Sequence, residues 1–288
     1  MSMDTRQLSI RYPKAPMLAN RFATRGMRAL DAIEKIEAIS ISEPLEKPSL
    51  TNSIGMRLGH IFAGSFQMGN PRSQTSPFLS ETQHTTALTQ DFYIGCFQVT
   101  QGQYQKVIRE NPSCFWGKRN SKDTADFPVE NVSWYQAYAF CLFLSALPEE
   151  REAGRVYRLP TEAQWEYACR AGSTKAYCCG DDMIMLDQYA WHGSNSRSST
   201  NAVGQKSPNE WGLYDMHGNV LEWCADWYGQ YPSEACVDPV GPDKGYGRVF
   251  RGGAYDFNPE LCGSAFRSMN HPTYRMNNLG FRVAMECL

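Results

Sequence analysis

Three segments of the chain share a helix-start pattern in which a Ser or Thr is followed three residues later by Gln. They begin at Thr100, Ser133 and Thr161. In such a capping box the hydroxyl accepts a backbone N–H of the first turn, and the Gln side chain bonds back to the residue that begins the helix. We expect the second helix to run to about Leu147 and the third to stop at Gly172.

Around these helices the chain is predicted to form short strands and long ordered loops. Residues 57–70 indicate two short strands around a turn at Ala63-Gly64, and residues 92–99 indicate a strand that leads into the first helix. The later part of the chain is rich in Gly, Asn, Ser and Pro, which argues against a doubly wound sheet. We therefore expect an α+β fold of low regular secondary structure. The buried stripe of the second helix should contain Trp134, Ala137, Tyr138, Cys141 and Leu144.

Composition excludes several classes of protein. The chain has 288 residues, 42% of them apolar, which indicates a globular protein with a sizeable core. A net charge of -2 argues against binding nucleic acid through bulk electrostatics. No apolar run is long enough to span a bilayer, and the N-terminus shows no apolar signal segment. We expect a cytoplasmic protein with reduced thiols, although a surface or secreted location stays open. The ten cysteines include no C-x-x-C pair.

The first part of the chain, residues 1–49, differs from the main domain at 50–288. Apolar residues recur there at helical spacing, which predicts one amphipathic helix near residues 20–38 and a linker at Ser40 to Pro48. We expect this helix to pack on the main domain, and packing on a partner is the alternative. The apolar residues of its predicted stripe are Phe22, Met27, Leu30, Ile33 and Ile36.

Residues 247–288 combine two kinds of position. The first kind, here called the frame residues, is expected to maintain the fold: Arg251, Gly252, Gly253, Ser264, Ala265, Arg267, Pro272, Arg275 and Gly280 to Val283. The second kind, here called the interleaved residues, is of mixed size and polarity: Tyr255, Asp256, Phe257, Asn258, Leu261, Phe266, Ser268, Asn270, His271 and Tyr274. We expect the interleaved residues to lie at the surface, because Tyr, Phe, Asn, Ser and His supply contact area and adaptable hydrogen bonds in binding surfaces.

Several separated motifs, in order, resemble the formylglycine-generating enzyme (sulfatase-modifying factor) family. The matching segments are Phe66–Gly69, Val99–Tyr104, Pro128–Ala137, Arg158–Gly172, Asn209–Trp223, Arg251–Gly253 and Gly280–Arg282. The resemblance covers roughly residues 52–285 and implies a C-type-lectin-like fold. It does not imply one function, because this fold carries both enzymes and binding proteins.

The family's oxidases hold one copper ion between two cysteines, five residues apart, just after the Gly-Gly motif. Counting from Gly253 places Cys262 at the second position and Phe257 at the first. Since a phenylalanine cannot ligate Cu(I), we expect no copper and no catalytic residue. Cys262 would be catalytic only if an unidentified second thiol completed the pair. No paired histidines and no nucleophile-elbow motif support an iron site or a hydrolase.

The resemblance also implies a structural calcium site around the G-N-x-x-E-W motif. In this chain the pattern gathers the carbonyls of Gly218 and Val220 with Asp215 and Glu222. Oxygen donors of this kind are those that calcium prefers. The alternative is that Asp215 and Glu222 only accept hydrogen bonds from loop amides.

Residues 247–288 further resemble the variable region of proteins diversified by retroelements, which often have this lectin-like fold. There, adenine-directed mutation turns Asn codons into Tyr, Asp, Ser, His, Phe, Leu or Gly codons. Most of the interleaved residues belong to that set, whereas Glu260 and Met269 fit less easily. We therefore expect a non-catalytic binding protein whose ligand is a protein rather than a sugar. The alternatives are an undiversified family member, with Phe257, Leu261 and Phe266 in its core, and a copper-dependent formylglycine-generating oxidase.

Overall fold

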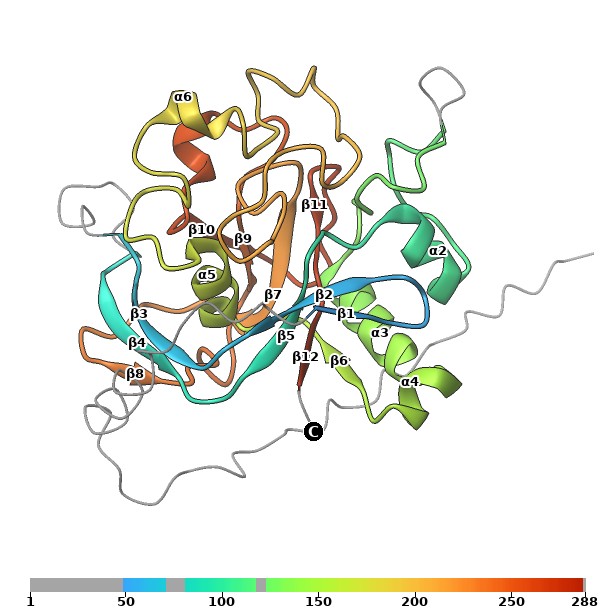
Figure 1. Ribbon diagram of the computed structural model, residues 1–288, viewed down its shortest axis with the longest axis horizontal. Coiled ribbons are helices and arrows are strands. Elements are labelled where there is room, and N and C mark those ends of the chain that lie inside the picture. Colours follow the sequence, from blue (N-terminus) through green and yellow to red (C-terminus); the bar gives the residue numbers. More distant parts are fainter. Residues whose placement is uncertain (1–48, 71–80, 118–122, 287–288) are drawn as a thin grey trace, which may run out of the picture.

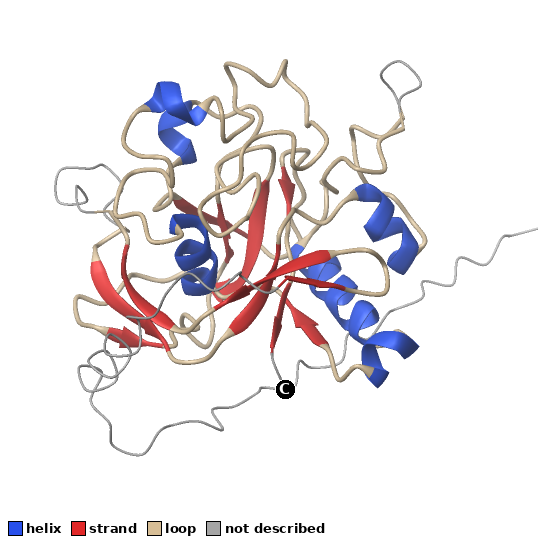
Figure 2. Cartoon of the chain, viewed as in Figure 1, coloured by secondary structure: helices blue, strands red, loops and turns tan. Residues whose placement is uncertain are grey.

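The computed structural model describes residues 49–70, 81–117 and 123–286. Short helices lie around three small sheets, and long loops cover much of the molecule (Figures 1 and 2). The helix expected near residues 20–38 lies outside the described residues. None of the helices in the described ranges combines the length and apolar character needed to cross a bilayer.

The largest sheet joins the two ends of the main domain. Its strand order is β1-β2-β5-β12-β6, and β12 pairs antiparallel with both β5 and β6. The C-terminal strand is therefore an inner strand of the sheet that also contains the first described residues. The strands are β1 (Ser49–Thr51), β2 (Arg57–Ile61), β5 (Phe92–Gly95), β12 (Ala284–Glu286) and β6 (Val156–Arg158).

The other two sheets position the C-terminal segment. One has the order β10-β9-β7-β11 and takes β9, β10 and β11 from residues 248–280. The third has the order β3-β4-β8 and contains the hairpin predicted around Ala63-Gly64. Their strands are β7 (Leu221–Trp227), β9 (Arg248–Arg251), β10 (Arg267–Asn270), β11 (Leu279–Gly280), β3 (Gly64–Met68), β4 (His84–Leu88) and β8 (Cys236–Val237).

All three predicted capping boxes are confirmed. In each, the side chain of Thr100, Ser133 or Thr161 accepts from the backbone N–H three residues later, and the Gln at that position bonds back. The third helix ends one residue earlier than predicted, because Ala171 adopts the left-handed conformation with φ 47°. The helices are α2 (Gln101–Ile108), α3 (Trp134–Ser145), α4 (Pro148–Glu152), α5 (Glu162–Arg170), α6 (Met183–Leu186) and the 3-10 helix η1 (Pro259–Cys262).

The buried stripe of α3 differs from the prediction at one position. Trp134, Ala137, Cys141 and Leu144 are buried, but Tyr138 is only half-buried. Tyr138 stacks on Trp134 with ring centroids 5.2 Å apart, so its ring lies at the rim of the core. Phe140 is fully buried in its place.

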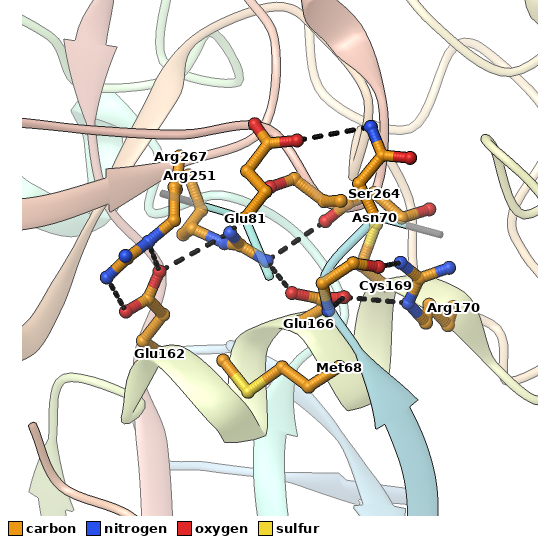
Figure 3. A network of polar contacts seen from close by, with 12 residues as sticks. Met68, Asn70, Glu81, Glu162, Glu166, Cys169, Arg170, Arg251, Ser264 and Arg267 are labelled. Atoms are coloured by element: carbon orange, nitrogen blue, oxygen red, sulfur yellow. Dashed lines mark hydrogen bonds and ion pairs between the residues drawn. The ribbon is translucent and has the colours of Figure 1, made fainter. Parts of the chain in front are cut away.

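A buried network of arginines and carboxylates joins α5 to β9 and β10 (Figure 3). Glu166 on α5 accepts from Arg170 at 2.8 Å, from the Gly69 backbone N–H at 2.8 Å and from Arg251. Burial alone would raise the pKa of Glu166, but the guanidinium groups of Arg251 and Arg170 hold it below its usual value. Glu162, one turn earlier, receives two hydrogen bonds of 2.7 Å from Arg267.

We predict that Glu166→Gln lowers the free energy of unfolding by about 3–5 kcal/mol, because it leaves buried guanidinium charge without its partner. Urea unfolding of the full chain at pH 7 measures the loss. The exposed Glu152 on α4 provides a control. Its change to Gln should stay within about 0.5 kcal/mol. A Glu166→Gln loss no larger than that of Glu152→Gln would contradict the assigned role of the network.

Candidate functional site

The frame residues of the C-terminal segment are buried. Arg251, Ser264 and Arg282 are fully enclosed, and Arg275 is the exposed exception. Arg251 donates to the carbonyl oxygens of Ser264 and Ala265, both at 3.0 Å. Because these carbonyls precede β10, Arg251 fixes the point at which the chain returns from the loop after β9.

Backbone conformation and close packing explain why two glycines follow Arg251. Gly252 has φ +82°, a left-handed conformation that favours glycine. A Cβ at Gly253 would lie 2.4 Å from the Cys262 sulfur and 2.4 Å from the His217 carbonyl oxygen. The loop from Gly253 to Cys262 is therefore closed tightly at its base.

Most of the interleaved residues lie at the surface. Asp256, Asn258, His271 and Tyr274 are exposed. Tyr255 differs, since only 4% of its surface is exposed and its ring packs edge-to-face on Phe115. Its side chain therefore offers little to a ligand. Partly exposed are Phe257, Leu261, Phe266, Ser268 and Asn270.

The interleaved residues form two local groups. In the first, around η1, the rings of Phe257 and Phe266 make an edge-to-face contact at 5.8 Å. In the second, after β10, the backbone N–H of Tyr274 donates to the His271 carbonyl at 2.8 Å in a turn. His271 also contacts the ring of the exposed Tyr246 at 5.7 Å.

Exposed apolar residues beside the first group were missed by the sequence reasoning. Met183, Ile184 and Met185 on α6 are exposed, Ile184 by 78%. The helix α6 lies next to η1 at one end of the molecule (Figure 1). The sequence feature that could have predicted this exposed apolar helix is the short apolar run between Asp182 and Asp187.

A cavity of about 320 Å³ lies beside η1. The C-terminal segment contributes Glu260 and Phe266 to its lining, and α5 and the loop after it contribute Arg170 and Tyr177. The cavity therefore offers both signs of charge and an aromatic ring beside the first group.

At the position of the family's copper site, the histidine next to Cys262 is bonded to backbone groups through both ring nitrogens. Cys262 is fully buried, and burial raises the pKa of its thiol to about 12. Burial lowers the pKa of His217 to about 4, so its imidazole is neutral. One ring nitrogen of His217 bonds to the Cys262 carbonyl at 2.8 Å, and the other accepts from the Cys178 N–H at 3.0 Å. Within the described ranges, no three His, Cys, Asp or Glu side chains form a metal-binding group.

The residues predicted to hold calcium are brought together. The carbonyl oxygens of Asp215, Gly218 and Val220 and the Glu222 carboxylate all surround one atom, the side-chain Nε2 of Gln98. As placed, they do not fit a calcium ion, because an N–H donor already occupies the point on which they converge. Calcium binding itself stays a prediction without a test.

Comparison with known protein families shows the family to which this chain belongs. Residues 55–287 match the "Sulfatase-modifying factor enzyme 1-like domain" family. The chain belongs to this family. The solved structure of Treponema denticola variable protein 1 superposes with a TM-score of 0.75 at 31% identity, covering 85% of this chain and 100% of that one. For PvdO from Pseudomonas aeruginosa the TM-score is 0.70 at 26% identity, with the same coverage. The expected C-type-lectin-like α+β fold is confirmed.

The family also includes enzymes. The formylglycine-generating enzyme of Streptomyces coelicolor is 38% identical over 176 residues, which cover 55% of this chain and 52% of that enzyme. The formylglycine-generating enzyme of Bos taurus is 36% identical over 179 residues, which cover 57% and 45%. The chain thus spans about half the length of these curated relatives.

We predict that the Cys262 thiol resists alkylation by iodoacetamide in the folded protein at pH 8. A buried thiol whose pKa is raised contributes almost no thiolate, which is the reactive form. The exposed Cys114 provides the internal control and should be alkylated. Mass spectrometry of peptides from native and urea-unfolded samples measures both. Equal labelling of Cys262 and Cys114 in the native protein would contradict the buried environment assigned to Cys262.

Proposed function

We propose that this chain is a non-catalytic binding protein that presents the exposed interleaved residues of its C-terminal segment to a protein ligand. The observation that carries the proposal is the division of that segment into mostly buried frame residues and interleaved residues that, except for Tyr255, are partly or fully exposed. The exposed positions carry carboxylate, amide, imidazole and phenol groups, which suit contact and hydrogen bonding with a partner.

The surroundings of these positions favour a protein over a sugar. Met183, Ile184 and Met185 provide an exposed apolar ridge beside η1, and Tyr246 adds an aromatic ring beside His271. Apolar and aromatic side chains within a polar rim are typical of protein interfaces. A structural neighbour that is named a variable protein supports the same interpretation.

We further propose that the interleaved residues are diversified by a retroelement. The frame residues are mostly enclosed, so exchange there would disturb packing, whereas exchange at Asn258, His271 or Tyr274 would not. Neighbouring DNA tests this proposal. A reverse transcriptase gene and a near-copy of the 3′ end that differs at adenines would support it. The lack of both would refute diversification and leave the binding proposal untouched.

A binding test uses the full chain as bait. We predict that the double variant His271→Ala/Tyr274→Ala binds its protein partner at least about tenfold more weakly, because exposed aromatic residues dominate interface energies. The partner is first captured by crosslinking to the biotinylated wild type, and dissociation constants are then measured with purified partner. The control is Phe143→Ala, an exposed apolar change on α3 outside the C-terminal segment. Equal loss in the control, or no loss in the double variant, would contradict the proposal.

The second candidate function is a copper-dependent formylglycine-generating oxidase. One observation favours it: Cys179 packs against the small buried cluster that contains Cys262. Against it, Phe257 stands at the first copper position and Cys262 is buried.

We predict that incubation with Cu(I), dioxygen and a cysteine-containing sulfatase peptide gives no aldehyde. Mass spectrometry of the peptide and the copper content per chain measure the outcome, and Cys262→Ser is the matched control. Stoichiometric copper binding with aldehyde formation that Cys262→Ser abolishes would establish the enzyme instead.

A further inference from the structure

Gln98 lies in the connection between β5 and α2 and is almost fully enclosed, with 1% of its surface exposed. Its side-chain Nε2 lies 2.9 Å from the Val220 carbonyl oxygen, 3.1 Å from that of Gly218 and 3.4 Å from that of Asp215. It also lies 3.0 Å from Oε1 of Glu222. These four oxygens are called the oxygen cage below.

The spacing of the oxygen cage suits an amide nitrogen. Three of the four distances from Nε2, 2.9–3.1 Å, are those of N–H···O hydrogen bonds, and the Asp215 carbonyl at 3.4 Å is a longer contact, whereas calcium binds oxygens at about 2.3–2.6 Å. The two hydrogens of the Gln98 amide are shared among the four acceptors. Each acceptor would otherwise be buried with fewer partners, which is costly.

The charge of the oxygen cage is already balanced. Arg282 donates to both oxygens of Glu222, at 2.6 and 2.7 Å, and the Trp165 indole N–H donates to one of them at 2.7 Å. In the Asp215 carboxylate, Oδ2 accepts from the Gly204 N–H at 2.8 Å, and Oδ1 is buried without a hydrogen-bond partner among the described residues. A divalent cation placed beside the buried Arg282 guanidinium would meet a like charge at close range.

The oxygen cage can hold either the Gln98 amide nitrogen or a cation, and the orientation of the Gln98 amide differs between these two states. With Nε2 directed inward, four acceptors meet a donor, and Oε1 is buried without a hydrogen-bond partner among the described residues. With Oε1 directed inward, four acceptors would meet a fifth, an arrangement that is repulsive unless a cation lies between them. The bidentate Arg282–Glu222 pair favours the first state, because it leaves the oxygen cage with no uncompensated negative charge.

We propose that the Gln98 amide takes the place of a cation in the oxygen cage, so that this part of the fold is held without calcium. The contact ties the β5–α2 connection to the residues that lead into β7. Asn219, within the same stretch, accepts the Tyr255 backbone N–H at 2.9 Å. The oxygen cage thereby supports the loop that carries the first group of interleaved residues. The proposal is independent of what that loop binds.

The first experiment uses the wild-type full chain. Metal content is measured by mass spectrometry after purification without chelator, and the Tm is measured in EGTA and in excess CaCl₂. The expected result is well under one calcium per chain and the same Tm in both buffers. About one calcium per chain, with a wild-type Tm that falls in EGTA, would overturn the proposal.

The second experiment introduces a carboxylate. In Gln98→Glu a negative charge faces the four acceptors, so the Tm in EGTA should fall by on the order of 5 °C or more, and CaCl₂ should restore it. Gln98→Met removes the donor without adding charge and is the matched control. Its Tm should also fall, but CaCl₂ should not restore it. A Gln98→Glu variant as stable as the wild type in EGTA would contradict the assigned role of the amide. The wild-type measurement decides the matter if either variant fails to fold.

Discussion

The architecture of the C-terminal segment depends on the buried ion pairs between α5 and the strands β9 and β10. Arg251 has no exposed surface, so its charge requires the Glu166 carboxylate within the same enclosed space. Its Nη1 and Nη2 also donate to the Ala265 and Ser264 carbonyls, respectively. Arg267 is held in the same way by Glu162. Helix α5 thus provides the anions, and the C-terminal segment provides the cations that bind to them. The loop between β9 and β10 is therefore held at both ends by contacts that involve no interleaved side chain.

This arrangement separates the fold from the identity of the surface residues. The contacts that shape the loop are made by backbone groups: Tyr255 N–H to Asn219 O, Phe257 N–H to Ala254 O and Leu261 N–H to Asn258 O. Such contacts do not depend on which side chain is present, unless that residue is proline. Four interleaved side chains do contribute, since Asp256 accepts from Asn278, Phe257 packs on Phe266 and Tyr255 packs on Phe115. Exchange of surface side chains therefore leaves the backbone contacts of the loop intact, which is what an exchangeable binding surface requires of its scaffold.

The sequence predicted features that depend on near neighbours and missed those that depend on distant ones. The capping boxes at Thr100, Ser133 and Thr161 are local, and all three were found. The resemblance of the G-N-x-x-E-W motif to the family implied that oxygens of Asp215 and Glu222 converge, and they do. The burial of Tyr255 depends on Phe115, and the filling of the oxygen cage depends on Gln98, more than one hundred residues away from each partner. No spacing rule reports such contacts, because they arise only when the loops pack.

Cys262 illustrates how the family pattern and the packing of this chain are related. A thiol at this position needs no copper to explain it, because the space beside Gly253 and the His217 carbonyl accepts a small side chain. A larger residue would press on backbone atoms that close the base of the loop. Phe257 is not under this constraint, since it is only partly buried and its ring packs on Phe266. The two copper positions of the family thus differ in this chain. The enclosed position holds a residue that packing favours, and the partly exposed position lies in the segment that we propose to form the binding surface.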